Sequence, residues 1–143
     1  MRQRFAAILL VLGLIATACG GSSGTVFDLG VGDCFNDENL ETEVVTDVST
    51  VPCSEPHDNE IYFEFSMTDP AFPGQNAAFE AANQRCREEF EAFVGLDYFE
   101  SDLDAFSIVP TPESWEEGDR GALCALYAVD LSKLTGSMRG AAR

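Results

Sequence analysis

The chain has 143 residues, 45% of them hydrophobic, and its 25 acidic against 8 basic residues give a formal charge of −17 at pH 7. This length supports one domain with one hydrophobic core. The negative charge repels phosphate backbones, which argues against nucleic acid as a partner and against docking on anionic lipid through basic patches.

The N-terminus predicts a lipoprotein signal peptide over residues 1–18. Arg2 and Arg4 precede an apolar run over residues 5–15, which is too short to span a bilayer. The run ends in Ala16-Thr-Ala-Cys19, which resembles a bacterial lipobox with alanine in place of the usual leucine. We therefore expect Cys19 to be lipidated and to open a flexible tether over residues 19–27. The alternative is an ordinary secretory signal cleaved near Ala18.

A lipid on Cys19 would hold the protein at the extracytoplasmic face of the cell membrane, with the membrane itself as its first partner. Because Arg2 and Arg4 leave with the leader, the charge of the processed chain changes from −17 to −19. Such a charge is typical of a soluble domain in a crowded extracellular space.

Three strands are predicted in the first half of a domain that we place at residues 28–138. The first is a strand entry over Thr25 to Phe35 with glycine turns at 30 and 32, and the second covers 42–48, which is rich in β-branched residues. The third covers 60–67 and alternates as a half-buried strand does. One face carries Ile61, Phe63, Phe65 and Met67, and the other carries Tyr62, Glu64 and Ser66.

One amphipathic helix is predicted over 76–94, with Asn76 as N-cap and Gly95 as a left-handed C-cap. Its apolar stripe consists of Phe79, Ala82, Cys86, Phe90 and Phe93. Strands over 103–109 and 122–131 follow, separated by a loop over 110–118. The tail from 132, including 139–143 beyond the domain, is expected to fray. This order predicts an α+β fold in which one amphipathic helix covers a small, mostly antiparallel sheet.

The cysteines predict two disulfides. An odd count of five becomes even once Cys19 is lipidated, and export to an oxidising compartment favours pairing of the other four. Of the three possible connectivities we prefer Cys34–Cys53, which closes a short N-terminal segment, and Cys86–Cys124, which ties the helix stripe to the last strand. A zinc site is the weaker alternative, because no Cys-x-x-Cys pair is present.

The only histidine, His57, lies close to Asp58 and Glu60 and could act as a general base, a metal ligand or a pH sensor. A metal site would need a further ligand, and the favoured interpretation is a histidine that caps the turn before a strand. Calcium is the other metal considered, at Asp33, Asn36, Asp37 and Glu38. The EF-hand pattern is absent there, which favours a solvated loop. We expect no cofactor.

Trp115 also has two interpretations. It could anchor a partner on a surface that includes Glu113, Glu116 and Glu117, but a tryptophan that covers the end of a small core is favoured. Asp119 and Arg120 are expected to form an ion pair within a turn. No Gly-x-Ser-x-Gly turn of a serine hydrolase is present in the sequence.

Four motifs carry a family resemblance. They are Gly32-Asp-Cys-Phe35, Val51-Pro-Cys-x-x-Pro-His-Asp-x-Glu60, Trp115-x-x-Gly-Asp-Arg120 and Thr135-Gly-Ser137. With them the chain resembles the septum-formation domain family of actinobacterial exported and membrane-anchored proteins, over residues 28–138. The resemblance implies a cell-envelope domain with a link to septation.

These observations favour a lipid-anchored envelope domain without enzymatic activity, which binds a protein or cell-wall partner that the sequence does not identify. The candidate functional surface comprises His57, Asp58, Glu60, Trp115, Asp119 and Arg120. The alternative is an envelope enzyme or a metal-dependent binder centred on His57, Asp58 and Glu60.

Overall fold

The computed structural model describes residues 23–25, 28–37 and 47–143, and the predicted signal peptide, Cys19 and Glu38 lie outside these ranges. The elements, in chain order, are β1 (Ser23–Thr25), β2 (Cys34–Phe35), β3 (Asp47–Val51), β4 (Asn59–Ser66), α1 (Gln75–Val94), the 3-10 turn η2 (Tyr98–Glu100), β5 (Leu103–Ile108), α2 (Pro112–Glu116) and β6 (Gly121–Ala128).

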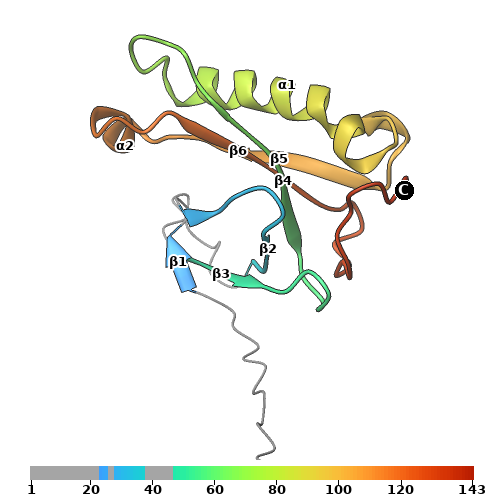
Figure 1. Cartoon of the computed structure of the whole chain (residues 1–143). Helices are drawn as coiled ribbons and strands as arrows, with labels where there is room; N and C mark the ends of the chain where they lie inside the picture. Colours follow the sequence, from blue (N-terminus) through green and yellow to red (C-terminus); the bar gives the residue numbers. More distant parts are fainter. Residues whose placement is uncertain (1–22, 26–27, 38–46) are drawn as a thin grey trace, which may run out of the picture.

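The strands form one curled antiparallel sheet in the order β1-β3-β2-β4-β6-β5. The long strands β4, β6 and β5 make its main part, and α1 lies along one face of them (Figure 1). The short strands β1, β3 and β2 curl away on the other side (Figure 1). The predicted α+β fold, with a small antiparallel sheet under one helix, is confirmed.

The face of α1 that packs on the sheet consists of Ala78, Ala82, Cys86, Phe90, Phe93 and Val94. The helix ends at Gly95 in the left-handed conformation (φ 85°), as predicted, and the amide of Gly95 donates to the carbonyl of Glu91. Two predictions here are wrong. The N-cap is Gly74 and not Asn76, and Phe79 stays 39% exposed because Ala78 takes the inward position.

A bulge in β4 breaks the predicted alternation of side chains. Ile61 pairs with Ala125 and Phe63 with Cys124, so Tyr62 is an extra residue on β4. Ile61 and Phe63, which were expected on one face, therefore lie on opposite faces. Ile61 packs with Phe35 under β2, whereas Phe63 packs against the α1 side. Tyr62 was expected to face outward but is buried against α1, where its hydroxyl donates to the Cys86 carbonyl.

The N-terminal strands are shorter than the long strands of the sheet. Within the predicted strand entry over 25–35, a turn at residues 31–32 lies at the predicted glycine turns and precedes the two-residue strand β2. Residues 42–46 of the predicted strand over 42–48 lie outside the described ranges, and β3 contains its last two residues and continues to Val51.

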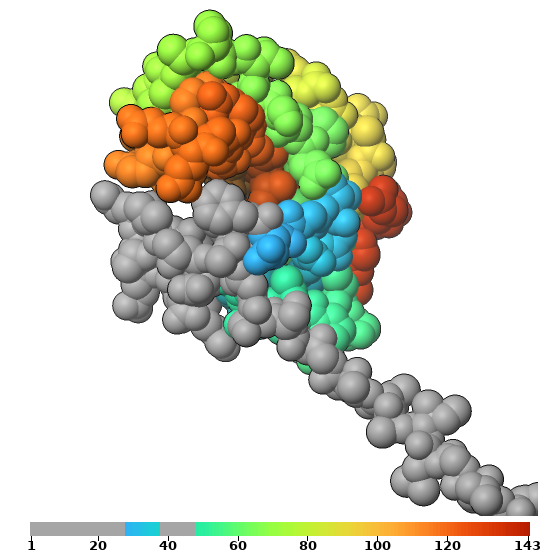
Figure 2. All heavy atoms as spheres, turned by 60° about the vertical axis from the view of Figure 1, so that its left-hand side comes forward, coloured from blue at the N-terminus to red at the C-terminus, as the bar shows by residue number. Residues whose placement is uncertain are grey.

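Two segments that were expected to be irregular are ordered. The predicted loop over 110–118 contains α2, whose N-cap Thr111 and Ser114 form a capping box. Figure 2 shows this segment, in orange, against the start of α1 and the loop before it. The tail does not fray. Leu134 and Met138 are buried, and the amides of Gly140 and Ala142 donate to the carbonyls of Phe93 and Val94.

Both predicted disulfides are confirmed. The Cα atoms lie 5.3 Å apart in Cys34–Cys53 and 5.4 Å apart in Cys86–Cys124. Among the described residues, no helix combines the length and the apolar character that a membrane span requires.

Candidate functional site

The turn between β3 and β4 holds His57 inside the molecule. Its backbone forms a two-way bridge with Leu134 of the C-terminal segment. The amide of His57 donates to the Leu134 carbonyl at 3.0 Å, and the amide of Leu134 donates to the His57 carbonyl at 2.8 Å. The disulfide from Cys53 to Cys34 fixes the start of the same turn. His57 is fully buried as a result.

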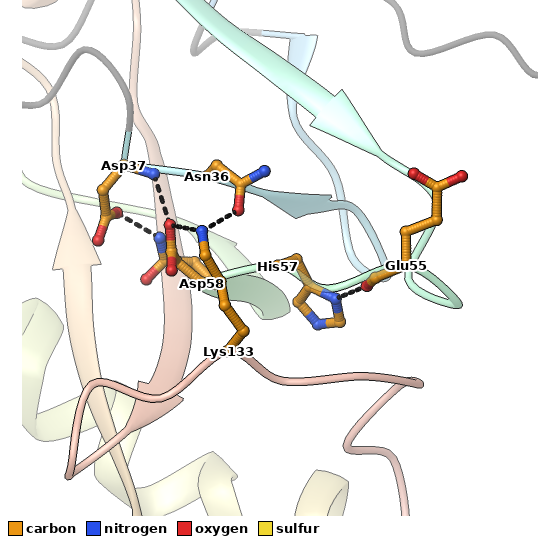
Figure 3. A network of polar contacts seen from close by, with 7 residues as sticks. Asn36, Asp37, Glu55, His57, Asp58 and Lys133 are labelled. Atoms are coloured by element: carbon orange, nitrogen blue, oxygen red, sulfur yellow. Dashed lines mark hydrogen bonds and ion pairs between the residues drawn. The ribbon is translucent and has the colours of Figure 1, made fainter.

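The imidazole ring of His57 uses only one of its two nitrogens. Nδ1 lies 2.8 Å from the carbonyl oxygen of Glu55 (Figure 3). A carbonyl only accepts hydrogen bonds, so Nδ1 carries a hydrogen, and in the neutral ring Nε2 presents a lone pair. Nε2 is buried and has no hydrogen-bond partner. The ring therefore caps the turn before β4, as favoured from the sequence, and leaves an unused ligand atom inside the protein.

Glu60 is a second buried polar group at this corner. Its Oε1 accepts from the hydroxyl of Ser137 at 2.5 Å, and its Oε2 accepts from the amide of Met138 at 2.7 Å. Both donors come from the segment that was expected to fray, so this carboxylate anchors the C-terminal segment to β4. No ion pair among the described residues includes Glu60.

Cys34, His57 and Glu60 converge in the interior. One ligand atom from each, namely Sγ, a ring nitrogen and a carboxylate oxygen, lies within 4.8 Å of the other two. All three residues are buried. Because Sγ of Cys34 is bonded to Cys53, the group is a closed structural cluster in this state.

Asp58, the middle residue of the predicted set, belongs to a surface network instead. Its Oδ2 accepts from Nζ of Lys133 at 2.6 Å and from the amide of Asp37 at 3.0 Å (Figure 3). Burial alone would raise the pKa of Asp58, but these donors outweigh it and hold the pKa below its usual range. The ionised Asp58 therefore stabilises the folded state at neutral pH, and this contribution is lost as the pH falls through that lowered pKa.

The second predicted group lies at the other end of β4. Trp115 of α2 is buried with Met67, next to the last residue of β4, and covers that end of the core, as favoured. The expected ion pair between Asp119 and Arg120 does not form. The guanidinium of Arg120 stacks on the Trp115 ring at 3.8 Å and donates to the carbonyls of Trp115 and Asp119. The Asp119 carboxylate accepts from Ser114.

The candidate functional surface is therefore not one surface. His57, Glu60 and Trp115 are buried. The described residues of the loop considered for calcium, Asp33, Asn36 and Asp37, each have a different partner. Asp33 accepts from the backbone amide of Gly30, Asp37 accepts from Nδ2 of the Asn59 side chain, and Asn36 accepts from Nζ of Lys133.

Sequence reasoning missed the contribution of the C-terminal segment to this corner. Lys133, Leu134, Ser137 and Met138 supply partners to the turn before β4 and to Glu60. The one available signal was the Thr135-Gly-Ser137 motif, where Gly136 has a positive φ of 84° and its amide donates to the Cys53 carbonyl.

The chain belongs to the septum-formation family, whose description is "Septum formation" and which matches residues 31–143. The match includes both disulfides, the buried cluster and the C-terminal segment. Comparison with curated proteins and with solved structures gives no match.

Proposed function

We propose that this protein is a lipid-anchored envelope domain that takes part in septation by binding another envelope protein and not by catalysis. Family membership over residues 31–143 supports the link to septation. Two disulfides support export to an oxidising compartment. The lipobox-like Ala16-Thr-Ala-Cys19 supports the anchor at the extracytoplasmic face of the membrane.

The anchor predicts a diacylated Cys19 at the new N-terminus. Mass spectrometry of membrane fractions should find a lipid-modified N-terminal peptide, and Cys19→Ser should move the protein out of the membrane fraction. Two acyl chains give stable anchoring, whereas one gives only marginal binding. An unmodified, soluble mature chain that begins at Cys19 would contradict the anchor.

The observation that carries the binding role is an apolar end of the sheet, defined by Phe99, Val129 and Leu131. These side chains are 85%, 59% and 78% exposed. Phe99 belongs to η2 and the other two to the turn after β6. The two segments lie at the same end of the sheet, because the amide of Val129 donates to the carbonyl of Asp102 at 3.0 Å.

Leu131 is the most informative member of the apolar end. Its φ of 59° lies in the left-handed region. That region costs a residue with a Cβ atom about 1–2 kcal/mol, and a glycine or asparagine adopts it more easily. A large apolar side chain at this position therefore has a conformational cost and is also exposed to water. Contact with a partner would remove the Leu131 side chain from water and so offset the cost of its exposure.

The charges around the apolar end indicate the chemistry of the partner. Asp97, Glu100 and Asp130 are exposed beside it, and Asp102 is paired with Arg143 at 3.0 Å. An acidic rim around apolar side chains is complementary to a segment that carries basic and apolar residues. The proposed partner is therefore an envelope protein with an exposed basic, amphipathic segment.

A fluorescent fusion of the full chain in dividing cells tests this proposal. We expect the wild-type fusion to be enriched at septa and the Phe99→Ser/Leu131→Ser variant to lose that enrichment at equal abundance and equal melting temperature. The matched control is Phe79→Ser, an exposed phenylalanine at the far end of α1, which should keep septal enrichment. A wild-type fusion that is not enriched, or a double variant that is, would contradict the proposal.

A further inference from the structure

The cluster of Cys34, His57 and Glu60 has three features that its structural role does not use. Nε2 of His57 is fully buried and has no partner. Glu60 is a buried carboxylate that forms no ion pair within the described part of the chain. The buried Sγ of Cys34 lies within 4.8 Å of ligand atoms of both. A ring nitrogen, a carboxylate oxygen and a sulfur atom thus lie close together in the interior.

The two cysteines of the Cys34–Cys53 disulfide differ in their exposure to solvent. Cys53 is partly exposed, whereas Cys34 is 1% exposed. A thiolate from solvent therefore attacks Cys53 first, and Cys34 is the leaving group, released into the cluster. The second disulfide offers no such entry, because Cys86 and Cys124 are 1% and 0% exposed. A gentle dithiol reductant should open Cys34–Cys53 alone.

The donor set that results is one that zinc prefers. Zn²⁺ binds a cysteine thiolate, a neutral imidazole nitrogen and a carboxylate oxygen at distances of about 2.0–2.3 Å. In a tetrahedral site such ligand atoms lie about 3.5 Å apart, so the 4.8 Å cluster has to contract by about an ångström. Glu60 keeps a free lone pair on each oxygen beyond its bonds to Ser137 and Met138. Two negative charges and one divalent cation bring the buried site to neutrality.

We propose that a dithiol reductant converts the Cys34–Cys53 disulfide into a zinc site with Cys34, His57 and Glu60 as its protein ligands. The dithiol is oxidised to its own disulfide, and its two electrons and two protons convert the Cys34–Cys53 bond into two thiols. Zn²⁺ then displaces the proton of the Cys34 thiol and binds Nε2 of His57 and a carboxylate oxygen of Glu60. Because only the reduced state binds the ion, zinc shifts the thiol–disulfide equilibrium towards reduction.

Cobalt binding to full-length chains with Cys19→Ser, which removes the fifth thiol, tests the site. In that background Cys53→Ser leaves Cys34 as a thiol without any reductant. We expect one Co²⁺ per chain, a thiolate-to-cobalt charge-transfer band and displacement by Zn²⁺. His57→Ala added to this variant should weaken binding by at least tenfold, since a metal ligand is lost, whereas Asp58→Asn, the neighbouring residue, should not.

The disulfide itself provides the second test, which does not depend on the folding of Cys53→Ser. The Cys19→Ser chain is reduced with a phosphine, which is removed before cobalt is added. The same chain with its disulfides intact serves as the control. We expect the charge-transfer band only in the reduced form, with Cys86–Cys124 still closed in a peptide map. Absence of the band after reduction, or a band that His57→Ala leaves unchanged, would overturn the proposal.

Discussion

Replacing Cys86 and Cys124 together by alanine is expected to destabilise the domain by about 4 kcal/mol. The disulfide closes a 38-residue loop, and the chain-entropy relation gives about 4 kcal/mol for a loop of that size. The bond also joins the buried face of α1 to the centre of β6. A domain of this size has about 5–15 kcal/mol of net stability, so the variant should be close to unfolding at 37 °C.

Urea denaturation of the two double variants measures this effect. The Cys34→Ala/Cys53→Ala variant is the comparison, because its loop spans 19 residues and the same relation gives about 3 kcal/mol. We expect the loss of Cys86–Cys124 to have the larger effect on the free energy of unfolding. A loss below about 1 kcal/mol for that pair would show that packing alone holds α1 on the sheet.

Glu60→Ala is expected to destabilise the domain by about 3 kcal/mol, because it leaves a buried donor unsatisfied and a cavity in the core. The amide of Met138 and the hydroxyl of Ser137 both lose their acceptor. The C-terminal segment should loosen first, which hydrogen exchange at the amide of Met138 would detect. Free energies of unfolding from urea titrations give the magnitude.

Two variants control for this effect. Glu60→Gln keeps an acceptor for the amide of Met138, and the Ser137 hydroxyl can turn to accept from the new amide group, so we expect a cost of about 1 kcal/mol. Glu64→Ala removes an exposed carboxylate from the same strand and should change stability by less than about 0.5 kcal/mol. Equal effects of Glu60→Ala and Glu64→Ala would contradict the anchoring role of Glu60.

Sequence patterns predicted those elements that are determined by residues close to one another in the chain. The period of the apolar residues from Ala82 to Phe93 located α1, because one face of the helix is buried. Gly95 located its end, because glycine readily adopts the left-handed conformation of a C-cap. Thr111 and Pro112 are a typical N-cap and first residue of a helix, but α2 has only five residues, too few to show an apolar periodicity, and a loop was predicted there.

The bulge in β4 and the order of the tail have non-local causes. Phe63 and Phe65 do alternate with polar residues, and only the pairing with β6 reveals that Tyr62 is the extra residue. Leu134 and Met138 are isolated apolar residues in a polar tail, so no apolar periodicity predicts that they are buried. Their positions depend on His57 and Glu60, more than 70 residues earlier in the chain.

The candidate site was predictable in part. The sequence indicated that the segment around His57 would be a disulfide-linked corner before a strand, and the structure agrees. It did not separate Asp58, which faces Lys133 at the surface, from His57 and Glu60, which point inward with Cys34. That separation follows from the bridge between His57 and Leu134, which no local pattern encodes.

The most direct test of the account compares His57→Ala with Phe99→Ser/Leu131→Ser for both melting temperature and septal enrichment in oxidised, folded protein. We expect His57→Ala to cost about 2 kcal/mol of stability through a lost hydrogen bond and a cavity, and to lower the melting temperature while septal enrichment persists. The Phe99→Ser/Leu131→Ser variant should keep the melting temperature of the wild type and lose septal enrichment. A His57→Ala protein that melts like the wild type but leaves the septum would contradict the account and place the binding function at the His57 turn.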